Sequence, residues 1–482
     1  MRQHHQPFIG RQEEQAILQK ALHSRDPEMV ALIGRRRVGK TFLVHTVYEN
    51  RIDFEISGIQ EATLREQLEN FANRLNAHAK PILPFRRPSN WSEAFQMLIT
   101  YLEGLQKQEK LVIFFDELPW LATRKSNFLK WFGYFWNSWA SQKHVVVVIC
   151  GSAASWMIAN VVRDRGGLHN RITRRITLMP FTLDETERFY KSRDIHFDRY
   201  QTIQLYMALG GIPHYLKEAE PGLSAAQNID RICFTSSGLL NDEFSLLYPA
   251  LFDDPETHLK IIRALANTWQ GMTRSDLIET AKLTNGGSTS DAIEELVTSG
   301  FVSSFFAFGK KKKEIRYRLT DEFSLFYLQF IEENRGEGKG TWQRLSQTQA
   351  WKSWSGYAFE NICLKHIPQI KKALGIAGVY SEASSFYAKG DAYRPGVQID
   401  LLIDRNDHVI NLCELKFYNS SFVPTKTFAA DMRTKIALFK AISGSNKQIF
   451  LTLITAFPML PNEHSIGLVD SALTMDVLFD GA

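Results

Sequence analysis

Short apolar runs, separated by longer amphipathic segments, dominate the first 225 residues of the chain. The runs are EMVALIG at 28–34, IDFEISG at 52–58, KLVIFFDE at 110–117 and HVVVVICGS at 144–152. Runs that are apolar at nearly every position are typical of parallel strands buried on both faces. Because the connections are long and helix-patterned, this region is predicted to be a doubly wound parallel α/β sheet.

The pattern becomes helical between about 235 and 340. Two predicted helices, 273–284 and 288–300, precede a predicted hairpin at 301–321. Gly309 and the four lysines Lys310 to Lys313 form the tip of that hairpin. A helix pair followed by a hairpin resembles a winged helix-turn-helix, and this is the fold expected for the middle of the chain.

A third region follows the stretch 333–343, whose glycine-rich polar composition predicts a linker. The expected elements are a helix at 355–367, strands near 378–382, 397–404 and 409–417, a helix near 425–442, and a strand at 447–455. The chain is therefore predicted to be a multidomain α/β protein with domains at 1–230, 235–340 and 345–482.

Composition narrows the class of protein only slightly. With 482 residues the chain is too long for one hydrophobic core. Its net charge of +5 is compatible with nucleic-acid binding but does not argue for it alone. No run of about 18 apolar residues is present to cross a membrane, and the N-terminus lacks a signal-peptide pattern. With four scattered cysteines, these features predict a cytoplasmic protein without a membrane partner.

A phosphate-binding motif, GRRRVGKT, lies between the first apolar run and a helical segment. It comprises Gly34, Arg35, Arg36, Arg37, Val38, Gly39, Lys40 and Thr41. Its spacing is G-x-x-x-x-G-K-[ST], and it stands in the strand-to-helix context that a P-loop requires. Lys40 is expected to neutralise the β- and γ-phosphate oxygens of ATP, and Thr41 to hold Mg²⁺ through its hydroxyl.

Acidic and polar residues end two of the other predicted strands. Asp116 suits the second Mg²⁺ ligand, and Glu117 suits the base that polarises the attacking water. Ser152 follows the next strand and is predicted to sense the γ-phosphate. Arg171 is a candidate phosphate contact within the chain or from a neighbouring subunit. Equally, Arg171, Arg174 and Arg175 form a solvated helix or loop face.

These segments, together with FIGRQEEQAIL and ALGGIPHYL, follow the order seen in a prokaryotic family. The chain resembles the archaeal-type ATPases, an AAA+/STAND-related group. The resemblance implies that the box of Phe8, Gly10 and Arg11 packs near the nucleotide base. It also implies that Gly211 and Pro213 lie against the nucleotide. Gln12 stands where the family usually has glutamate, so the role of that position is open.

Three charged residues interrupt two apolar strands of the third region: Asp400, Glu414 and Lys416. Residues two apart share a face of a strand, so Glu414 and Lys416 project together while Leu415 points into the core. A polar turn predicts that the two strands are antiparallel, which brings the carboxylates of Asp400 and Glu414 together. Such an oxygen site suits Mg²⁺ or Mn²⁺, with Glu360 on the preceding helix as a third acidic group.

This order of residues resembles the PD-(D/E)XK nuclease superfamily, and a domain of this restriction-endonuclease-like type is common in the ATPase family above. The resemblance implies catalytic roles for Glu360, Asp400, Glu414 and Lys416. Two other interpretations use the same residues. One is an ion pair on an exposed sheet face, and the other is a retained fold without activity.

The leading hypothesis is an ATP-hydrolysing protein whose nucleotide state controls a DNA-directed, metal-dependent nuclease. The basic hairpin tip favours contact with the DNA backbone. The helix predicted at 288–300, where a recognition helix would lie, carries Asp291, Glu294 and Glu295. This acidic surface disfavours reading of bases in the major groove. The alternative is a STAND-type signalling ATPase or DNA-binding regulator with an inactive C-terminal domain. The family resemblance implies that the protein forms homo-oligomers.

Overall fold

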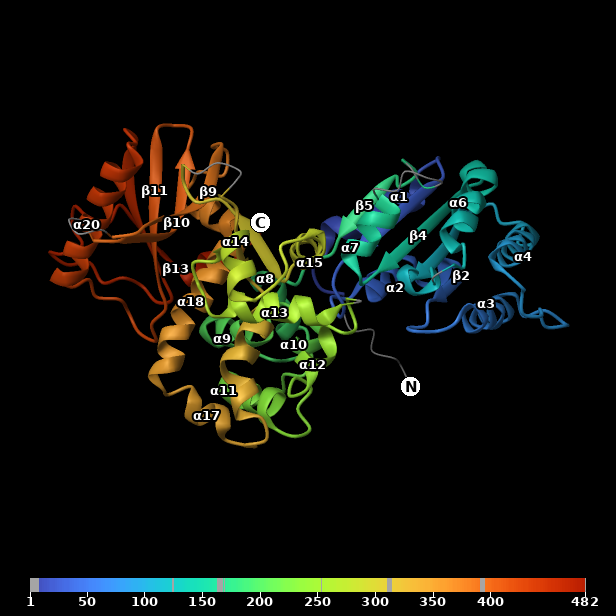
Figure 1. The fold of residues 1–482 in the computed structure, drawn as a ribbon, viewed down its shortest axis with the longest axis horizontal. Helices are drawn as coiled ribbons and strands as arrows, with labels where there is room; N and C mark the ends of the chain where they lie inside the picture. The colour runs from blue at the N-terminus through green and yellow to red at the C-terminus, as the bar shows by residue number, and fades with distance from the viewer. Residues whose placement is uncertain are drawn as a thin grey trace. The chain divides into compact units, whose positions relative to one another are not determined.

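A computed structural model describes residues 8–123, 125–162, 168, 170–252, 254–309, 314–390 and 395–481. The chain divides into two compact units, Met1–Pro180 and Phe181–Ala482. In Figure 1 the first unit is coloured blue to blue-green and the second green to red. The domain boundaries predicted near 230 and 340 both fall inside the second unit and stay predictions.

The N-terminal unit is built on a parallel sheet. Its strands are β1 (Glu28–Ile33), β2 (Ile52–Ser57), β3 (Leu111–Asp116), β4 (Val145–Gly151) and β5 (Arg174–Thr177), in the order β2-β3-β4-β1-β5. The four predicted strands are confirmed, because each run forms a parallel strand of this sheet, although β2 at its edge is only partly buried. Strand β5 was not predicted, and the expectation of a helix or loop at Arg174 and Arg175 is wrong. Only Ile176 of β5 is fully buried, so this edge strand has no apolar run to reveal it.

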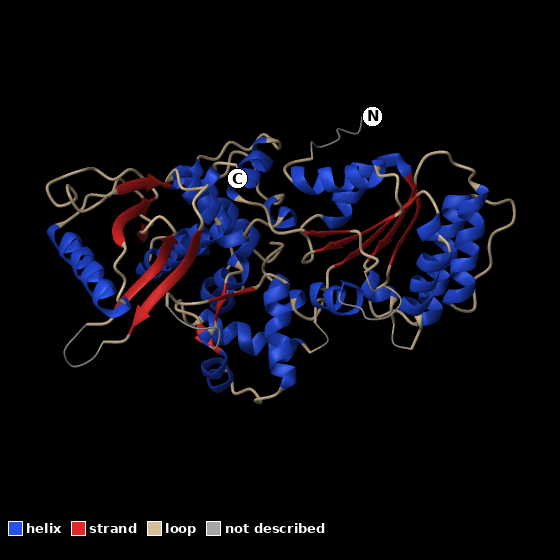
Figure 2. Cartoon of the chain, turned by 90° about the horizontal axis from the view of Figure 1, so that it is seen from above, coloured by secondary structure: helices blue, strands red, loops and turns tan. Residues whose placement is uncertain are grey.

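Helices cover both faces of this sheet, as Figure 2 shows. They are α1 (Gln12–His23), α2 (Lys40–Tyr48), α3 (Leu64–Ala79), α4 (Trp91–Gly104), α5 (Leu118–Leu121), α6 (Phe128–Ser138) and α7 (Ala154–Met157), with short turns η1 (Glu49–Arg51), η2 (Ala140–Gln142) and η3 (Ile158–Val162). Alternate strand residues such as Ile113 and Phe115 share one core with α3, α4 and α6. The doubly wound arrangement predicted from the sequence is therefore confirmed.

The C-terminal unit opens with helices and a close backbone contact. The helices are α8 (Leu183–Lys191), α9 (Arg199–Leu209), α10 (Pro213–Leu216), α11 (Ala225–Ile229), η4 (Asp230–Phe234) and α12 (Glu243–Leu247). Gly211 accepts a 2.6 Å hydrogen bond from the Phe181 amide. A Cβ at Gly211 would lie 2.0 Å from the Phe181 carbonyl oxygen, so only glycine allows this approach.

The middle of the chain combines three helices with a small antiparallel sheet. In chain order the elements are α13 (Pro255–Ala266), β6 (Met272–Thr273), α14 (Arg274–Thr280), α15 (Gly287–Thr298), β7 (Val302–Phe305) and β8 (Arg316–Leu319). The strand order is β6-β8-β7, so a short strand joins the expected hairpin. The predicted lysine-rich tip, Lys310 to Lys313, lies outside the described residues.

An aromatic core follows and includes part of the expected linker. The helices are α16 (Glu322–Phe326), η6 (Tyr327–Ile331), η7 (Glu332–Asn334), α17 (Thr341–Leu345), α18 (Gln349–Lys365) and α19 (Ile367–Ala373). Trp342, within the predicted linker 333–343, is 1% exposed, and its ring stacks on Phe234 with centroids 5.9 Å apart. Its amide donates to Asp230 over 2.7 Å. The second half of that stretch is thus packed rather than a free linker, which its glycine-rich composition concealed.

The chain ends in a mixed sheet with α20 (Lys426–Ser443) on one face, as Figure 1 shows at its orange and red end. The strands are β9 (Ser381–Ala388), β10 (Val397–Arg405), β11 (Val409–Lys416), β12 (Gln448–Thr455) and β13 (Ser471–Thr474), followed by η8 (Met475–Phe479). Their order is β13-β12-β11-β10-β9. Strands β10 and β11 are antiparallel as predicted, whereas β11, β12 and β13 are parallel.

The predicted strand at 378–382 is wrong in extent, since β9 runs from Ser381 to Ala388. Its sequence, SEASSFYA, is polar and only partly buried, as expected of an edge strand without an alternating pattern. Strand β13 was not predicted at all. Within the described part of the chain, no helix is both long enough and apolar enough to cross a bilayer.

Gly211→Ala is expected to lower the stability of the C-terminal unit by about 1–3 kcal/mol, because the added methyl overlaps the Phe181 backbone. The matched control is Gly356→Ala in α18, where an added Cβ meets no heavy atom within 4 Å. That control should be neutral or stabilising by up to ~1 kcal/mol. Calorimetric unfolding of both variants tests this, and equal transition temperatures would contradict the contact.

Candidate functional site

The loop after β1 has the backbone that a phosphate cradle needs. Gly34 follows β1 at a crowded position, where an added Cβ would lie 2.5 Å from the Leu178 carbonyl oxygen. Arg37 and Gly39 have φ of 71° and 94°, in the left-handed region. Gly39 caps α2, which begins at Lys40. The amides of the loop are therefore followed by a helix N-terminus, which favours an anion.

Lys40 is folded onto its own loop. Its Nζ donates to the carbonyl oxygens of Gly34 at 2.8 Å and Arg35 at 3.0 Å, and the residue is 5% exposed. A buried ammonium needs acceptors, and here the loop itself provides them. A triphosphate would offer charged acceptors, which form shorter and stronger hydrogen bonds with an ammonium than neutral carbonyls do.

The remaining predicted residues of this site form one hydrogen-bonded set. Thr41 Oγ1 donates to Asp116 Oδ2 over 2.8 Å, which links the start of α2 to the end of β3. Glu117, in the left-handed region at φ 45°, accepts at Oε2 from the amide and hydroxyl of Ser152, at 3.0 and 2.8 Å. The structure thus brings together Thr41, Asp116, Glu117 and Ser152 from three different segments.

The chemistry of this set fits Mg²⁺ and a reacting water. Thr41 and Asp116 present hard oxygen atoms, the ligands that Mg²⁺ prefers beside substrate phosphates. Ser152 fixes Oε2 of Glu117 with two hydrogen bonds, which leaves the other carboxylate oxygen, Oε1, to accept from a water. Beneath the site, burial raises the pKa of the Cys150 thiol, so this residue is an inert part of the core.

The other arginines and Val38 of the loop lie beside these residues. Val38 is 1% exposed and Arg35 is 4% exposed, whereas Arg36 and Arg37 are partly exposed. Arg171 is exposed and precedes β5. Because Arg174 of β5 pairs with Val30 of β1, Arg171 lies toward the amino ends of the strands. The P-loop follows their carboxyl ends, so the geometry does not favour a phosphate contact by Arg171 within this unit.

The predicted opening box lies next to α2. The Phe8 ring stacks on Phe42 with centroids 5.6 Å apart, and Phe42 directly follows Thr41. Arg11 is 6% exposed and donates to the Met179 carbonyl. Gly211 and Pro213 belong to the C-terminal unit, where Pro213 begins α10, so their predicted contact with nucleotide stays a prediction.

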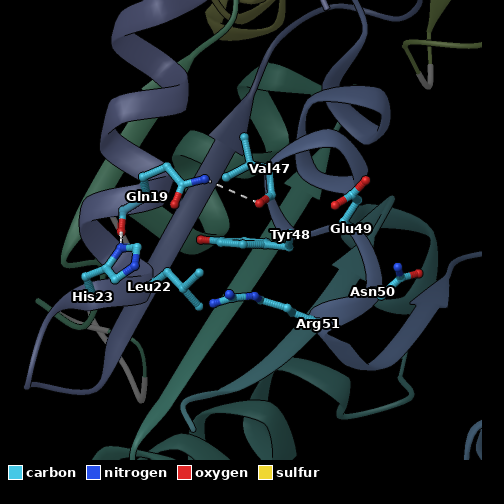
Figure 3. Close-up of a pocket in the computed structure, with 8 residues that line it drawn as sticks. All are labelled: Gln19, Leu22, His23, Val47, Tyr48, Glu49, Asn50 and Arg51. Atoms are coloured by element: carbon cyan, nitrogen blue, oxygen red, sulfur yellow. Dashed lines mark hydrogen bonds between the residues drawn. The ribbon is translucent and has the colours of Figure 1, made fainter. Parts of the chain in front are cut away.

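A cavity of about 490 Å³ lies at the other end of α2 (Figure 3). Tyr48 lies across its middle, with Gln19 on one side and Arg51 on the other. Since α2 spans nine residues, this cavity is roughly 13 Å from Lys40. It is therefore separate from the phosphate loop.

A second group of predicted residues meets on β10 and β11. Leu401 pairs with Cys413, and one further step of this register sets Asp400 opposite Glu414. The pairing of β10 with β9 shifts between Ile399 and Leu402, which marks a bulge at Asp400. Bulges of this kind commonly re-aim a side chain beside an active site. The two acidic residues predicted to converge are thus on neighbouring strands.

Glu414 is 7% exposed and accepts from two lysines. Lys416 Nζ lies 2.8 Å from Oε1, and Lys435 Nζ lies 2.8 Å from Oε2. Burial acts to raise the pKa of Glu414, but the two lysines outweigh it and hold that pKa below its ordinary value. Lys435 was not predicted. Lys435 lies on the same face of α20 as the buried residues Ala429, Met432 and Phe439. A lysine on an apolar helix face could have indicated a buried acidic partner.

Glu360, on α18, is electrostatically close to the same group. Burial, and then the Asp400 carboxylate, raise the pKa of Glu360 to about 8. Arg318 of β8 faces Asp400 and Glu360; burial lowers the pKa of its guanidinium, and the two carboxylates oppose that shift. Arg318 was also missed by the sequence analysis, because it belongs to the middle of the chain.

Asp400 and Glu414 fit Mg²⁺ by the chemistry of their oxygen atoms. Among the described residues, no three His, Cys, Asp or Glu side chains are close enough together to hold a metal. Mg²⁺ does not require such a cage, since it is commonly held by one or two carboxylates together with waters and substrate phosphates. The residues present therefore suit a site that a phosphate ligand completes.

Comparison with known proteins agrees with the first of these two sites. Residues 8–219 match the family described as an ATPase domain predominantly from Archaea. This part of the chain is therefore similar to archaeal-type ATPase domains, which supports the predicted resemblance for these residues. The match ends before the carboxylate group, so the predicted nuclease resemblance is not supported by it.

Similar proteins are known at low identity. The chain is 22% identical to an uncharacterized protein of Methanocaldococcus jannaschii, over 89% of this chain and 92% of that protein. Among solved structures, the Walker-type ATPase of Pyrococcus abyssi is 19% identical with a TM-score of 0.49, covering 67% of this chain and 96% of that one. The ORC2 protein of Aeropyrum pernix is 13% identical with a TM-score of 0.41, covering 70% and 95%.

Glu117→Gln is expected to slow ATP hydrolysis about 10²-fold or more while ATP binding is retained, because the amide cannot accept a proton from water. Ser152 donates to one oxygen only, so the variant keeps that hydrogen bond. Single-turnover hydrolysis and nucleotide titration measure the two effects separately. Glu13→Gln, an exposed change on α1, is the control, and wild-type turnover by Glu117→Gln would remove Glu117 from the mechanism.

Proposed function

We propose that this protein hydrolyses ATP and that its nucleotide state controls a metal-dependent nuclease formed by residues 345–482. The N-terminal part of the proposal rests on the archaeal-type ATPase domain and its P-loop. The C-terminal part rests on the residues gathered around Asp400 and Glu414. Cleavage of DNA is the reaction that this second group supports best.

One observation carries the nuclease proposal. Asp400 and Glu414 lie on neighbouring antiparallel strands beside a bulge in β10, with a lysine two residues after Glu414. Burying the Glu414 carboxylate among apolar side chains costs several kcal/mol of desolvation free energy. We attribute the presence of this buried charge to a functional role. The elements α18, β9, β10, β11, α20 and β12 also come in the order helix, three strands, helix, strand, which the restriction-endonuclease-like resemblance implies.

The residues have distinct roles in this proposal. Asp400 and Glu414 would hold Mg²⁺, with Mn²⁺ as a substitute, through their carboxylate oxygens and the Leu415 carbonyl. The metal, when bound, supplies an activated water and a charge on the scissile phosphate. Lys416, which is paired with Glu414, would supply positive charge for the scissile phosphate. Glu360 is the third acidic group of the proposed site, and burial, followed by the Asp400 carboxylate, raises its pKa to about 8.

The middle of the chain would hold DNA through its backbone. The order of α13, β6, α14, α15, β7 and β8 is that of a winged helix, with β7 and β8 as the wing. Asp291 and Glu294 are exposed on α15, so this helix is a poor reader of bases. Lys310 to Lys313, between β7 and β8 in the sequence, would supply positive charge for phosphate contacts.

A second candidate function follows from the ion pairs of Glu414. Both of its oxygens accept from lysines, which is the arrangement expected if the site binds no metal. In that case the chain is a STAND-type signalling ATPase, or a DNA-binding regulator, whose C-terminal domain only binds a partner. Assembly of several copies would suit either function.

Asp400→Asn is expected to abolish Mg²⁺-dependent cleavage of plasmid DNA, because the amide cannot replace a carboxylate as a metal ligand. Gel analysis of nicked and linear DNA measures the effect. The control is Glu463→Gln, whose side chain is 86% exposed and lies in the same unit. Cleavage by Asp400→Asn at the wild-type rate would assign the activity elsewhere, and absence of cleavage by wild type would favour the second candidate function.

A further inference from the structure

A short segment of the middle region touches the carboxylate site from outside. We call Trp269, Gln270 and Gly271 the strap; it joins α13 to β6. The strap is far in sequence from the acidic residues, and no motif marks it. Its side chains nevertheless contact the direct neighbours of both Asp400 and Glu360.

Gln270 is connected to Asp400 by two hydrogen bonds in series. Its Nε2 donates to Gln398 Oε1 over 2.7 Å, and Gln398 Nε2 donates to Asp400 Oδ1 over 2.7 Å. Gln398 and Asp400 are two residues apart on β10 and share a face. Because the Asp400 carboxylate only accepts, the Gln398 amide turns its NH₂ group toward Asp400, and the Gln270 donor stabilises that orientation by binding the Gln398 oxygen.

Trp269 contacts a helix neighbour of Glu360. Its ring lies flat on Tyr357, with centroids 4.5 Å apart and an interplanar angle of 5°. Tyr357 precedes Glu360 by three residues on α18, so the two side chains lie on one face of that helix. The two side chains of the strap thus reach one neighbour of each acidic group.

The strap is itself fixed to the small sheet. Gly271 has φ of 67°, and a Cβ there would lie 2.6 Å from the Tyr317 carbonyl oxygen. Arg316 Nη1 donates to the carbonyl oxygens of Gly271 at 2.7 Å and Gln270 at 3.3 Å. Strand β8 also carries Arg318, which faces Asp400 and Glu360. A displacement of β8 would therefore move the strap.

We infer that Trp269 and Gln270 are positioning residues for the metal site, and that they transmit the position of the middle region to Asp400. This inference rests on the proposed function, because it needs Asp400 to bind a cation. With Gln270 in place, the Gln398 amide donates to Asp400 Oδ1, so Oδ2 is the oxygen that would bind the cation. Engagement of nucleic acid by β7 and β8 then alters the affinity of the site for metal.

The test is binding of Mn²⁺ alone to the full chain without nucleotide, followed by electron paramagnetic resonance. Gln270→Ala is expected to weaken the site about 10–100-fold, the usual effect of losing an outer-shell partner of a metal ligand. Gln270→Glu should weaken it at least as much, because its carboxylate attracts the Gln398 NH₂ group away from Asp400. Gln270→Lys keeps a donor to Gln398 and should retain most of the affinity.

Three controls separate the possible results. Gln343→Ala, an exposed change on α17, should bind Mn²⁺ as wild type does. Asp400→Asn identifies the fraction of Mn²⁺ bound at the site; no change with that variant would overturn the proposed metal site and the inference with it. Loss with Asp400→Asn but wild-type affinity in Gln270→Ala would overturn the inference alone. Equal loss in Gln270→Ala and Gln270→Lys would show a packing role instead.

Discussion

The paired salt bridges of Glu414 are the interaction on which the C-terminal sheet depends. This carboxylate is buried on the face of β11 that packs against α20, among apolar side chains such as Leu412 and Met432. Removing one partner of a buried ion pair costs about 3–5 kcal/mol, because the remaining charge is left without compensation. Lys416 and Lys435 share that task here, so loss of either leaves one lysine to neutralise Glu414.

The same constraint organises the nucleotide end of the protein. Lys40 is buried, and its ammonium is satisfied by carbonyl oxygens of the loop that precedes it. Asp116 accepts from Thr41, and Glu117 accepts from Ser152. In both sites, the charged groups that the proposed function uses are held by neighbouring groups of the protein. A site built in this way is stable without ligand and ready to bind one.

The residues that were predictable from sequence lie close to one another along the chain or follow a strong pattern. The P-loop reads from Gly34 to Thr41, and Asp116 and Glu117 end an apolar run that forms β3. Strands β1, β3 and β4 are buried on both faces, so their sequences are nearly continuous in apolar residues. The antiparallel pairing of β10 with β11 followed from the polar turn between them.

What sequence could not predict depends on contacts between distant segments. Lys435 of α20 binds Glu414 of β11, and Gln270 binds Gln398, which lies 128 residues further along the chain. Edge strands β5 and β9 bury too few side chains to leave a pattern. Trp342 lay in a glycine-rich stretch, yet its ring is part of a core. In each case the partner, rather than the residue itself, determines the role.

The central claim is that nucleotide bound at the P-loop controls the carboxylate site. The most direct measurement compares cleavage of supercoiled plasmid DNA by wild type and Lys40→Ala, in Mg²⁺, with and without ATP. Our account predicts that ATP changes the cleavage rate of wild type, and that Lys40→Ala cleaves at one rate regardless of ATP because it cannot bind the triphosphate. An equal response of both proteins to ATP, or cleavage by wild type that ATP does not alter, would contradict it.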